Sequence, residues 1–293
     1  MRRLDGTILG RIVAQTAKDL EVRRLARREA GEDLTRAARQ APPPRDLLGA
    51  LGAGARDRGL ALLAELKPRS PSRGALVAGE PPVGALAQAY AAHADAMSVL
   101  CDAPFFGGGY PLLRRVRHMM DSVIHKPARP LPLLAKDFVI DPEQLLEARA
   151  AGADAVLLMA SVLDPAELSE LAAEAARLGL AALVETHDEA EIEVALSLGA
   201  PLVGVNSRDL RSLEIDLPRA RACLAHLGAE AARRRTPVLR VAESGLADPS
   251  AVDATRGLAE ACLIGSEIMT APDPAARMTE LGFPAHDARP ERR

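Results

Sequence analysis

The chain has 293 residues, 48% of them hydrophobic and 26% charged, with a formal net charge of −3 and a pI near 6.1. This length suits one large α/β domain, because a single (β/α)8 barrel takes about 250 residues plus insertions. The composition supports a sizeable core and excludes a disordered chain. Since the mild acidity supplies no basic field for nucleic-acid phosphates, we expect small-molecule partners and neither nucleic acid nor membrane.

Cysteine and histidine spacing argues against disulfides and metals. Cys101, Cys223 and Cys262 lie far apart, are odd in number and form no CxxC pair, and the six histidines show no HxxxH or HExxH spacing. These patterns favour a reducing cytoplasm and no metal site. The amino end is too densely charged for a signal peptide, and no window approaches the roughly 18 apolar residues of a membrane span. We therefore expect a soluble cytoplasmic protein.

The amino-terminal part predicts helices ahead of the main fold. Residues 7–30 mix regularly spaced Ile, Ala and Leu with Arg, Lys and Glu, which predicts an amphipathic helix. Pro42, Pro43 and Pro44 then break the chain. A second short helix is predicted in "RDLLGALGAGARD", so the helical extension covers about residues 1–58.

Eight short apolar runs follow, separated by longer segments rich in Ala, Leu and charged residues. This alternation is typical of βα units around a parallel sheet. Two intervening segments, "DPEQLLEARAAG" and "DPAELSELAAEAARLG", open on Asp-Pro and close on Gly, as capped helices do. Eight repeats favour a closed (β/α)8 TIM barrel over an open doubly wound sheet. The predicted strands are "LALLAELK" from Leu60, "AMSVL" from Ala96, "LPLLAK" from Leu131, "AVLLMA" from Ala155, "LAALVE" from Leu180, "PLVGVN" from Pro201, "PVLRVAES" from Pro237 and "ACLIGS" from Ala261.

These elements predict a single barrel domain over residues 1–283, including the extension, and a flexible tail over residues 284–293. "PARPLP" before the third strand is too rich in proline for a core element and is expected to be a loop. "FFGGGY" at 105–110 lacks the glycine spacing of a dinucleotide fingerprint and is expected to be a mobile loop. "RRR" at 233–235 is expected to be a solvated helix end.

Polar side chains stand at the ends of several predicted strands. In such barrels the chemistry takes place at the carboxyl ends of the strands, where the βα loops gather. Taken singly, Lys136 could be solvated or paired with Asp137, a glutamate could be an ordinary loop carboxylate, and Asn206 could form a turn. Their convergence on one mouth favours a functional site instead. The residues concerned are Glu65 and Lys67 after the first strand, Lys136 after the third, Glu185 after the fifth, Asn206 after the sixth, and Glu243 and Ser244 after the seventh.

Glycines after the last two strands indicate a phosphate site. Gly245 follows strand seven, and Gly265 with Ser266 follows strand eight. Loops at these two places commonly bind a phosphate through backbone N–H groups and a helix amino end. Ser70, in "KPRSPSRG", could add a hydroxyl, so the pattern predicts a phosphorylated substrate.

These motifs resemble those of the indole-3-glycerol phosphate synthase family, which closes the indole ring in tryptophan biosynthesis. "AELKPRSPSRG", "SVLCDAPFFGGGY", "LLAKDFVID", "LVETHDEAE", "GVNSRDL", "VAESGL" and "LIGSEIM" look like that family's successive strand-end motifs, in the same order and over nearly the whole chain. The extra amino-terminal helix also fits, since the family carries one over the barrel mouth. The departures are Cys101, Ala103, Pro68-Arg69 and a longer "MMDSVIHKPARPL" segment, and none touches the residues assigned to chemistry.

The resemblance implies conversion of 1-(2-carboxyphenylamino)-1-deoxyribulose 5-phosphate to indole-3-glycerol phosphate, with loss of carbon dioxide and water and with no cofactor. It assigns the general acid to Lys136 and the general base to Glu185. Lys67 and Arg208 would meet the substrate carboxylate, and Phe106 would form an apolar wall for the aromatic ring. Ser70, Gly245, Gly265 and Ser266 would bind the phosphate, and Glu65, Asn206, Glu243 and Ser244 would hold the substrate and the lysines.

Some questions stay open at this point. A related barrel enzyme such as phosphoribosylanthranilate isomerase uses a Cys on strand one with an Asp, whereas this strand offers Glu65 and Lys67. A paralogue that only binds a phosphorylated metabolite would not need both Lys136 and Glu185. The division of acid roles between Lys67 and Lys136 is not set by the sequence, nor is the position of Asp137. We expect a monomer, with a weak dimer as the alternative.

Overall fold

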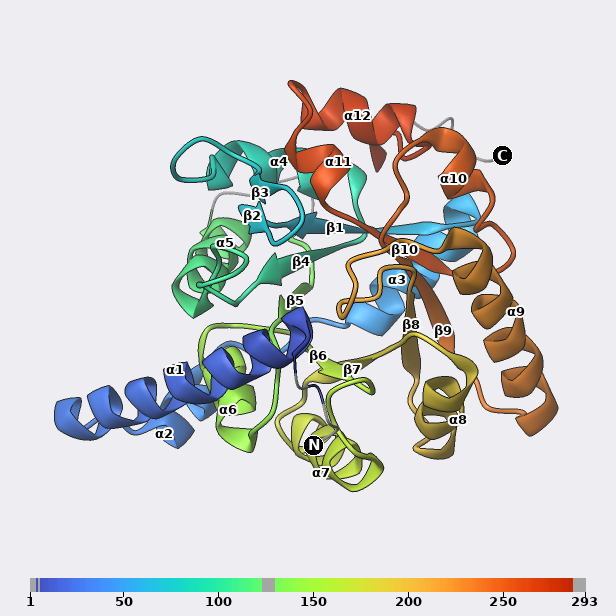
Figure 1. The fold of residues 1–293 in the computed structure, drawn as a ribbon. Coiled ribbons are helices and arrows are strands. Elements are labelled where there is room, and N and C mark those ends of the chain that lie inside the picture. The colour runs from blue at the N-terminus through green and yellow to red at the C-terminus, as the bar shows by residue number, and fades with distance from the viewer. Residues whose placement is uncertain (1–3, 5, 123–129, 287–293) are drawn as a thin grey trace.

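The protein is described by a computed structural model that covers residues 4, 6–122 and 130–286 (Figure 1). Eight parallel strands close into a barrel in chain order, with helices around the outside. This confirms the predicted (β/α)8 barrel with its amino-terminal helical segment. The barrel strands are β1 (Ala61–Leu66), β4 (Ala96–Leu100), β5 (Leu133–Lys136), β6 (Ala155–Met159), β7 (Ala181–Thr186), β8 (Leu202–Asn206), β9 (Leu239–Glu243) and β10 (Ala261–Ile264).

A short antiparallel hairpin, β2 (Arg69–Ser70) with β3 (Gly74–Ala75), follows β1 and was not predicted. The helix at 34–40 was not predicted separately either. The helices are α1 (Ile8–Ala30), α2 (Leu34–Gln40), α3 (Leu47–Arg58), α4 (Val83–His93), α5 (Tyr110–Ser122), α6 (Pro142–Ala150), α7 (Pro165–Arg177), α8 (Glu189–Ser197), α9 (Leu217–Arg234), α10 (Pro249–Asp253), α11 (Ser266–Met269) and α12 (Pro274–Glu280).

The strands are apolar because both of their faces are covered, one by the barrel interior and one by the helices. All six residues of β1 are buried, and so are Leu133, Leu134 and Ala135 of β5. Lys136, the last residue of β5, is only partly buried. The polar residues therefore begin where the strands reach the mouth of the barrel.

Helix starts follow the predicted capping chemistry. Asp141 caps α6 and Asp164 caps α7, each followed by proline at the first helical position. In α7 the side chain of Glu167 also bonds back to the cap, which completes a capping box. Because these caps satisfy N–H groups that lack partners inside the helix, they fix where each helix begins and where the preceding loop ends.

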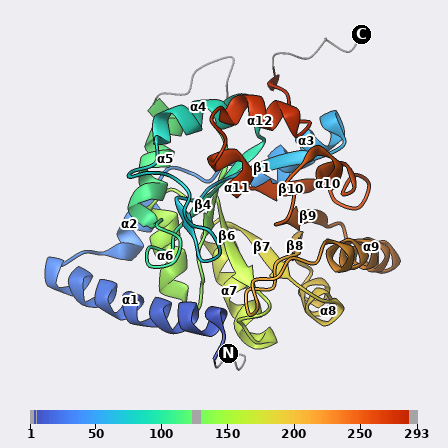
Figure 2. The ribbon, with the colours of Figure 1, turned by 45° about the horizontal axis from the view of Figure 1, so that its top comes forward.

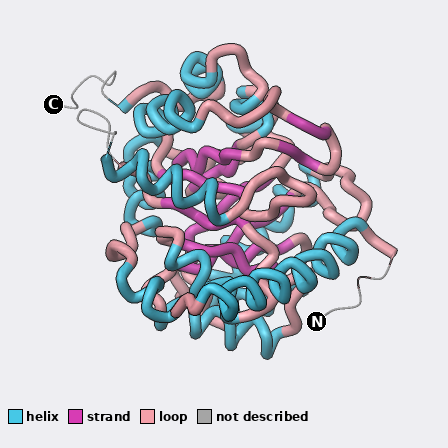
Figure 3. The backbone as a smooth tube through the Cα atoms, turned by 90° about the vertical axis from the view of Figure 1, so that its left-hand side faces the viewer, coloured by secondary structure: helices cyan, strands magenta, loops and turns pink. Residues whose placement is uncertain are grey.

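Helix α1 lies beside α6 (Figure 2), and Figure 3 shows from another side how helices surround the strands. Its amino end is capped by Thr7, and it ends at Gly31 with a φ of 65°. Buried Leu9, Ile12 and Val13 join the core. Farther along, arginines of α1 form ion pairs with carboxylates around the start of α6: Arg23 and Arg27 with Glu147, and Arg24 with Asp141 and Glu143. The helix is therefore held by an apolar half and a charged half.

Several smaller expectations can be compared with the structure. "FFGGGY" forms a turn that leads into α5, and "RRR" marks the end of α9, with Arg233 exposed. Of "PARPLP", residues 127–129 lie outside the described residues, as do residues 287–293 of the tail. Within the described ranges, none of the helices is long and apolar enough to cross a membrane.

Candidate active site

A cavity opens at the carboxyl ends of the strands, and it gathers nearly all the residues predicted for the site. Chain segments far apart in sequence meet there because all eight parallel strands end at the same face of the barrel. Glu243 lies behind the cavity wall, where it contacts Lys136. The predicted residues that line the cavity are Glu65, Lys67, Ser70, Phe106, Lys136, Glu185, Asn206, Arg208, Ser244, Gly245, Gly265 and Ser266.

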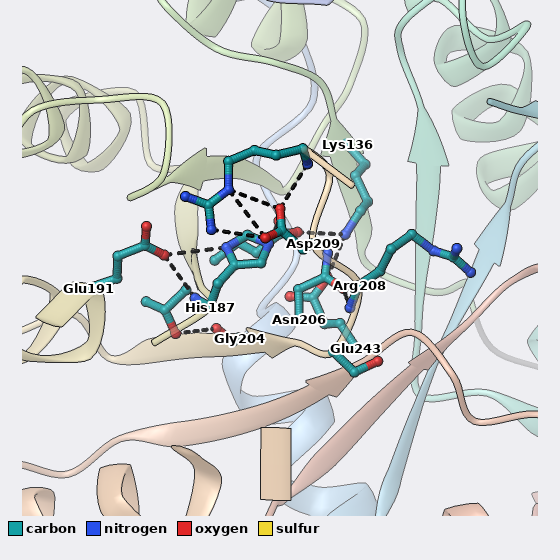
Figure 4. Close-up of polar contacts among 12 residues, drawn as sticks. Lys136, His187, Glu191, Gly204, Asn206, Arg208, Asp209 and Glu243 are labelled. Atoms are coloured by element: carbon teal, nitrogen blue, oxygen red, sulfur yellow. Dashed lines mark hydrogen bonds and ion pairs between the residues drawn. The ribbon is translucent and has the colours of Figure 1, made fainter. Parts of the chain in front are cut away.

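Lys136 contacts two buried carboxylates, those of Glu243 and Glu185, and Figure 4 labels Lys136 and Glu243. Its Nζ is 2.5 Å from Oε2 of Glu243 and 3.4 Å from Oε2 of Glu185. Both glutamate side chains are 1% exposed, whereas that of Lys136 is 13% exposed. Lys136, Glu185 and Glu243 come from β5, β7 and β9, alternate strands whose inward-facing side chains share a layer in such barrels. Lys136 and Glu185 thus both line the cavity, while Glu243 holds the ammonium from outside the lining.

Burial and charge set the protonation of this cluster. Burial alone would lower the pKa of Lys136, but the charges of Glu243 and Glu185 raise it above its ordinary value. Burial raises the pKa of Glu243 to about 7. The negative charge of Glu185 also raises it, whereas the positive charge of Lys136 lowers it. For Glu185, the pKa is lowered because Lys136 and His187 outweigh burial. Lys136 is therefore held as a charged ammonium and Glu185 as an ionised carboxylate.

A second lysine and glutamate pair follows β1. Nζ of Lys67 lies 2.5 Å from Oε2 of Glu65, and both side chains line the cavity. A side chain at position 265 would displace this pair, because a Cβ on Gly265 would lie 2.2 Å from Oε2 of Glu65. The cavity therefore contains two lysines, each held by a buried glutamate.

The loop after β9 takes an unusual backbone conformation. Ser244 and Gly245 both have positive φ, at 66° and 72°. Such values are rare for a serine and indicate local strain that the surroundings must hold. A Cβ at Gly245 would lie 2.8 Å from Cγ2 of Ile215, so only glycine fits this turn. The four residues predicted for phosphate binding, Ser70, Gly245, Gly265 and Ser266, all line the same cavity.

Arg208 and Asn206 sit together at the end of β8. Oδ1 of Asn206 accepts a hydrogen bond from the backbone N–H of Arg208 at 3.0 Å. Asn206 therefore forms the local turn considered from the sequence, and it also lines the cavity. Nη1 of Arg208 donates to the carbonyl of Leu213 at 3.0 Å. Burial lowers the pKa of Arg208, helped by the charge of Arg73.

An apolar wall is formed by Phe106 and Phe138, whose ring centroids are 5.8 Å apart. The turn that carries Phe106 is held by Asp102, whose Oδ1 accepts the backbone N–H groups of Phe105 and Phe106. Burial raises the pKa of Asp102 to about 6. This wall faces the same space as the lysines, as predicted for Phe106.

Asp137 is turned away from Lys136 and fixes the loop after β5. Its Oδ2 accepts hydrogen bonds from the Tyr110 hydroxyl at 2.7 Å and from Nε2 of Gln144 at 3.2 Å, and its Oδ1 accepts the Phe138 N–H. The two non-functional alternatives considered for Lys136, a solvated side chain and a pair with Asp137, are therefore wrong. Asp137 orients the loop, which the sequence left undecided.

Two features of the site were missed by the sequence prediction. Arg73, after the β2 strand, bonds Glu267 of α11 at 2.8 Å, and both line the cavity. His187 stands two residues after Glu185, just past the end of β7, and is 3% exposed. It stands inside the quoted motif "LVETHDEAE", but a single histidine gives no sign of its partners. In the part of the chain that the structure describes, no group of three or more His, Cys, Asp or Glu could hold a metal ion.

Solved structures with the same fold include 3-hexulose-6-phosphate synthase and tryptophan synthase subunit alpha from Legionella pneumophila, each 16% identical to this chain. The first has a TM-score of 0.56 and covers 76% of this chain and 98% of its own. The second has a TM-score of 0.54 and covers 80% and 95%. At this identity the likeness shows the fold alone. Fold and cavity together define the class: a (β/α)8 barrel with a polar cavity at the carboxyl ends of its strands.

Sequence relatives identify the family within that class. The family model described as "Indole-3-glycerol phosphate synthase" matches residues 9–281. The indole-3-glycerol phosphate synthase of Roseiflexus castenholzii is 43% identical over 279 residues, covering 94% of this chain and 98% of that protein. "Indole-3-glycerol phosphate synthase 2" of Streptomyces coelicolor is 42% identical over 275 residues, with the same coverage. The chain belongs to the indole-3-glycerol phosphate synthase family, a family of carboxy-lyases.

Proposed function

We propose that the protein converts 1-(2-carboxyphenylamino)-1-deoxyribulose 5-phosphate to indole-3-glycerol phosphate, with Lys136 as general acid and Glu185 as general base. The observation that carries the proposal is the placement of a charged ammonium and an ionised carboxylate 3.4 Å apart, both lining one cavity. General acid–base catalysis requires a donor and an acceptor within reach of the same substrate. Membership of the family supplies the reaction.

The chemistry uses each group in turn. Ring closure joins the aromatic carbon that bears the carboxylate to the ketone carbon, and the ketone oxygen takes a proton from Lys136. Loss of carbon dioxide then restores the aromatic ring. In the dehydration, the new hydroxyl leaves as water with a proton from an ammonium, while Glu185 accepts the proton that the substrate gives up. The enzyme gives two protons and receives one at Glu185, so each cycle takes up one proton from water, which matches the loss of a carboxylate as neutral carbon dioxide. No cofactor is needed.

Binding is assigned to the remaining residues of the cavity. Lys67 and Arg208 are the cations proposed for the substrate carboxylate, because charge-assisted bonds from such groups are strong. Phe106 is proposed to flank the aromatic ring. Glu65 and Glu243 hold the two lysines, and Asn206 and Ser244 complete the wall. The phosphate is assigned to Ser70, Gly245, Gly265 and Ser266.

The same proposal includes a monomer working in the cytoplasm, formed by one domain over residues 1–283. In its support, Cys101, Cys223 and Cys262 are all buried free thiols. Reduced cysteines suit a reducing compartment.

The direct experiment incubates the purified chain with the deoxyribulose phosphate and follows indole fluorescence. The buffer contains a chelator, so that turnover would not depend on a contaminating metal. We expect indole-3-glycerol phosphate and carbon dioxide in equal amounts. Absence of product from a folded sample would refute the proposed function.

A further inference from the structure

His187 is a buried titratable group that the proposed mechanism does not use. It follows the last residue of β7, one position after Thr186 and two after Glu185. The imidazole is not among the residues that line the cavity, so within the described chain it has no direct route to the substrate. It faces the catalytic cluster from behind.

Both ring nitrogens of His187 face carboxylates. Nδ1 is 3.3 Å from Oε2 of Glu191, and Nε2 is 3.6 Å from Oε1 of Glu185. Figure 4 shows the Glu191 side chain directed at His187. The same Glu191 oxygen accepts the backbone N–H of His187 at 2.8 Å. Glu191 is itself fixed, because its N–H is bonded to Asp188, the cap of α8.

The contact with Glu185 joins two unsatisfied atoms. Among the described residues, Oε1 of Glu185 and Nε2 of His187 are both buried and both lack a hydrogen-bond partner. Leaving such groups unpaired is costly, so a small closure of the 3.6 Å separation is favoured. Oε2 of Glu185 meanwhile faces Lys136. The two oxygens of the base therefore have separate neighbours, one at the cavity and one behind it.

A neutral imidazole cannot serve both carboxylates, because it has one N–H and one lone pair. If Nδ1 donates to Glu191, a neutral ring would point the lone pair of Nε2 at the carboxylate of Glu185. The imidazolium donates on both sides. Burial would lower the pKa of His187, but the hydrogen bond to Glu191 and the charge of Glu185 raise it. Geometry and charge thus both favour the cation.

We propose that His187, held by Glu191, is a positioning residue that fixes the carboxylate of Glu185 and keeps it ionised as the base. This rests on the proposed function of Glu185. Lys136 alone cannot balance both Glu185 and Glu243, and it loses its positive charge whenever it gives up a proton. His187 supplies a second positive charge that stays in place during that step. Charged and titratable groups from several elements surround His187. They are Glu185 on β7, Glu191 on α8, Lys136 on β5, Glu243 on β9, and Asp209 in the loop after β8, which is bonded to Arg211. Cys223 on α9 contacts the backbone carbonyl of His187.

The test is the pH dependence of kcat in His187→Gln, which keeps a donor near the Nε2 position without the charge. Removing a cation raises the pKa of Glu185, so the acidic limb of the profile should move up by about one pH unit. We expect kcat at its optimum to fall about tenfold with KM within about twofold. Glu191→Gln should move the limb in the same direction by less. The matched control is His226→Gln, because His226 lies 3.5 Å from Glu193 outside the cavity.

An unchanged acidic limb in folded His187→Gln would overturn the proposal. If that variant does not fold, a ¹⁵N NMR titration of His187 in the substrate-free wild type decides, since the proposal requires an imidazolium through neutral pH and a neutral ring would contradict it. The titration needs no turnover. A wild type that makes no indole would therefore refute the proposed function while the NMR result still judges the pairing of His187.

Discussion

Asp154 at the floor of the barrel and Glu185 at its mouth are both buried carboxylates, but their oxygens are engaged differently. Asp154 precedes β6, and its oxygens accept the N–H groups of Arg45 and Leu133 and a guanidinium N–H of Arg117, at 2.7 to 2.9 Å. Glu185 bonds to no backbone N–H in the described chain, and one of its oxygens is unpaired.

The difference separates a structural carboxylate from a chemical one. Backbone N–H groups cannot move away when a substrate arrives, so Asp154 is permanently occupied and ties loops to the barrel floor. The neighbours of Glu185 in the described chain are side chains: Lys136 and His187, together with Asn206 and Glu243. Those side chains can exchange one partner for another. Reactive groups are therefore found where buried charges are paired by mobile partners rather than saturated by the backbone.

The substitution expected to have the largest effect is Glu185→Gln, which keeps the size of the side chain and removes the proposed base. We expect kcat to fall by about 10² to 10³ with a much smaller change in KM. The unfolding temperature should fall, because Lys136 and His187 lose the buried negative charge that they share. Steady-state kinetics with thermal unfolding measures both. A kcat within a few-fold of wild type would show that Glu185 is not the base.

For Asp154→Asn, at the floor of the barrel, we expect a different outcome: a loss of stability with kcat nearly unchanged. An amide would place a donor against the N–H groups that the carboxylate now accepts, so the free energy of unfolding should drop by about 2–4 kcal/mol. The kcat of the folded fraction should stay within about twofold. The control is Asp253→Asn, since the Asp253 side chain is 68% exposed where it pairs with Arg256. Denaturant unfolding that found equal losses in the two variants would contradict the distinction.

A feature of the fold or the site could be predicted from the sequence where its signal is local. The eight strands could be predicted because apolar runs and Asp-Pro starts are local signals. The convergence of Lys136 and Glu185 also followed, because carboxyl ends of parallel strands meet at one face. The partner of Lys136 could not be predicted in this way, because Glu243 is 107 residues away in the sequence. Whether Lys136 pairs with Glu243 or with Asp137 depends on side-chain directions that the sequence does not give. The β2–β3 hairpin and the two carboxylates of His187 likewise arise from packing.

Glu243 offers a smaller test through pH. Its pKa is raised from 4.5 to about 7, so the native state holds a proton there that the unfolded state releases. Stability from this group is present below about 4.5 and is lost as pH rises towards about 7. Glu243→Gln should cancel that loss. Its unfolding free energy relative to wild type should therefore gain about 1–3 kcal/mol between those limits. A difference that does not vary with pH would mean that Glu243 stays ionised throughout.

The smallest effect is expected at the charged half of α1, where the pairs are partly exposed. Arg24, 25% exposed, bonds Asp141 at 2.6 Å. Arg24→Gln should cost about 0.5–1 kcal/mol of unfolding free energy at low salt, and less at high salt because ions screen the pairs. Arg28→Gln on the same helix, where the side chain is exposed, is the control. A loss that persists undiminished in high salt would show that Arg24 acts through packing.

The most direct measurement compares Lys136→Met with Lys67→Met, each with kcat, KM and unfolding temperature from one preparation. Methionine keeps similar bulk and removes the proton. If Lys136 is the acid held between Glu185 and Glu243, Lys136→Met should lose about 10² to 10⁴ in kcat while remaining folded and changing KM far less. Lys67→Met should mainly raise KM, because Lys67 is assigned to the substrate carboxylate. A folded Lys136→Met that retains kcat within a few-fold, with the large loss appearing in Lys67→Met, would contradict the account and make Lys67 the acid.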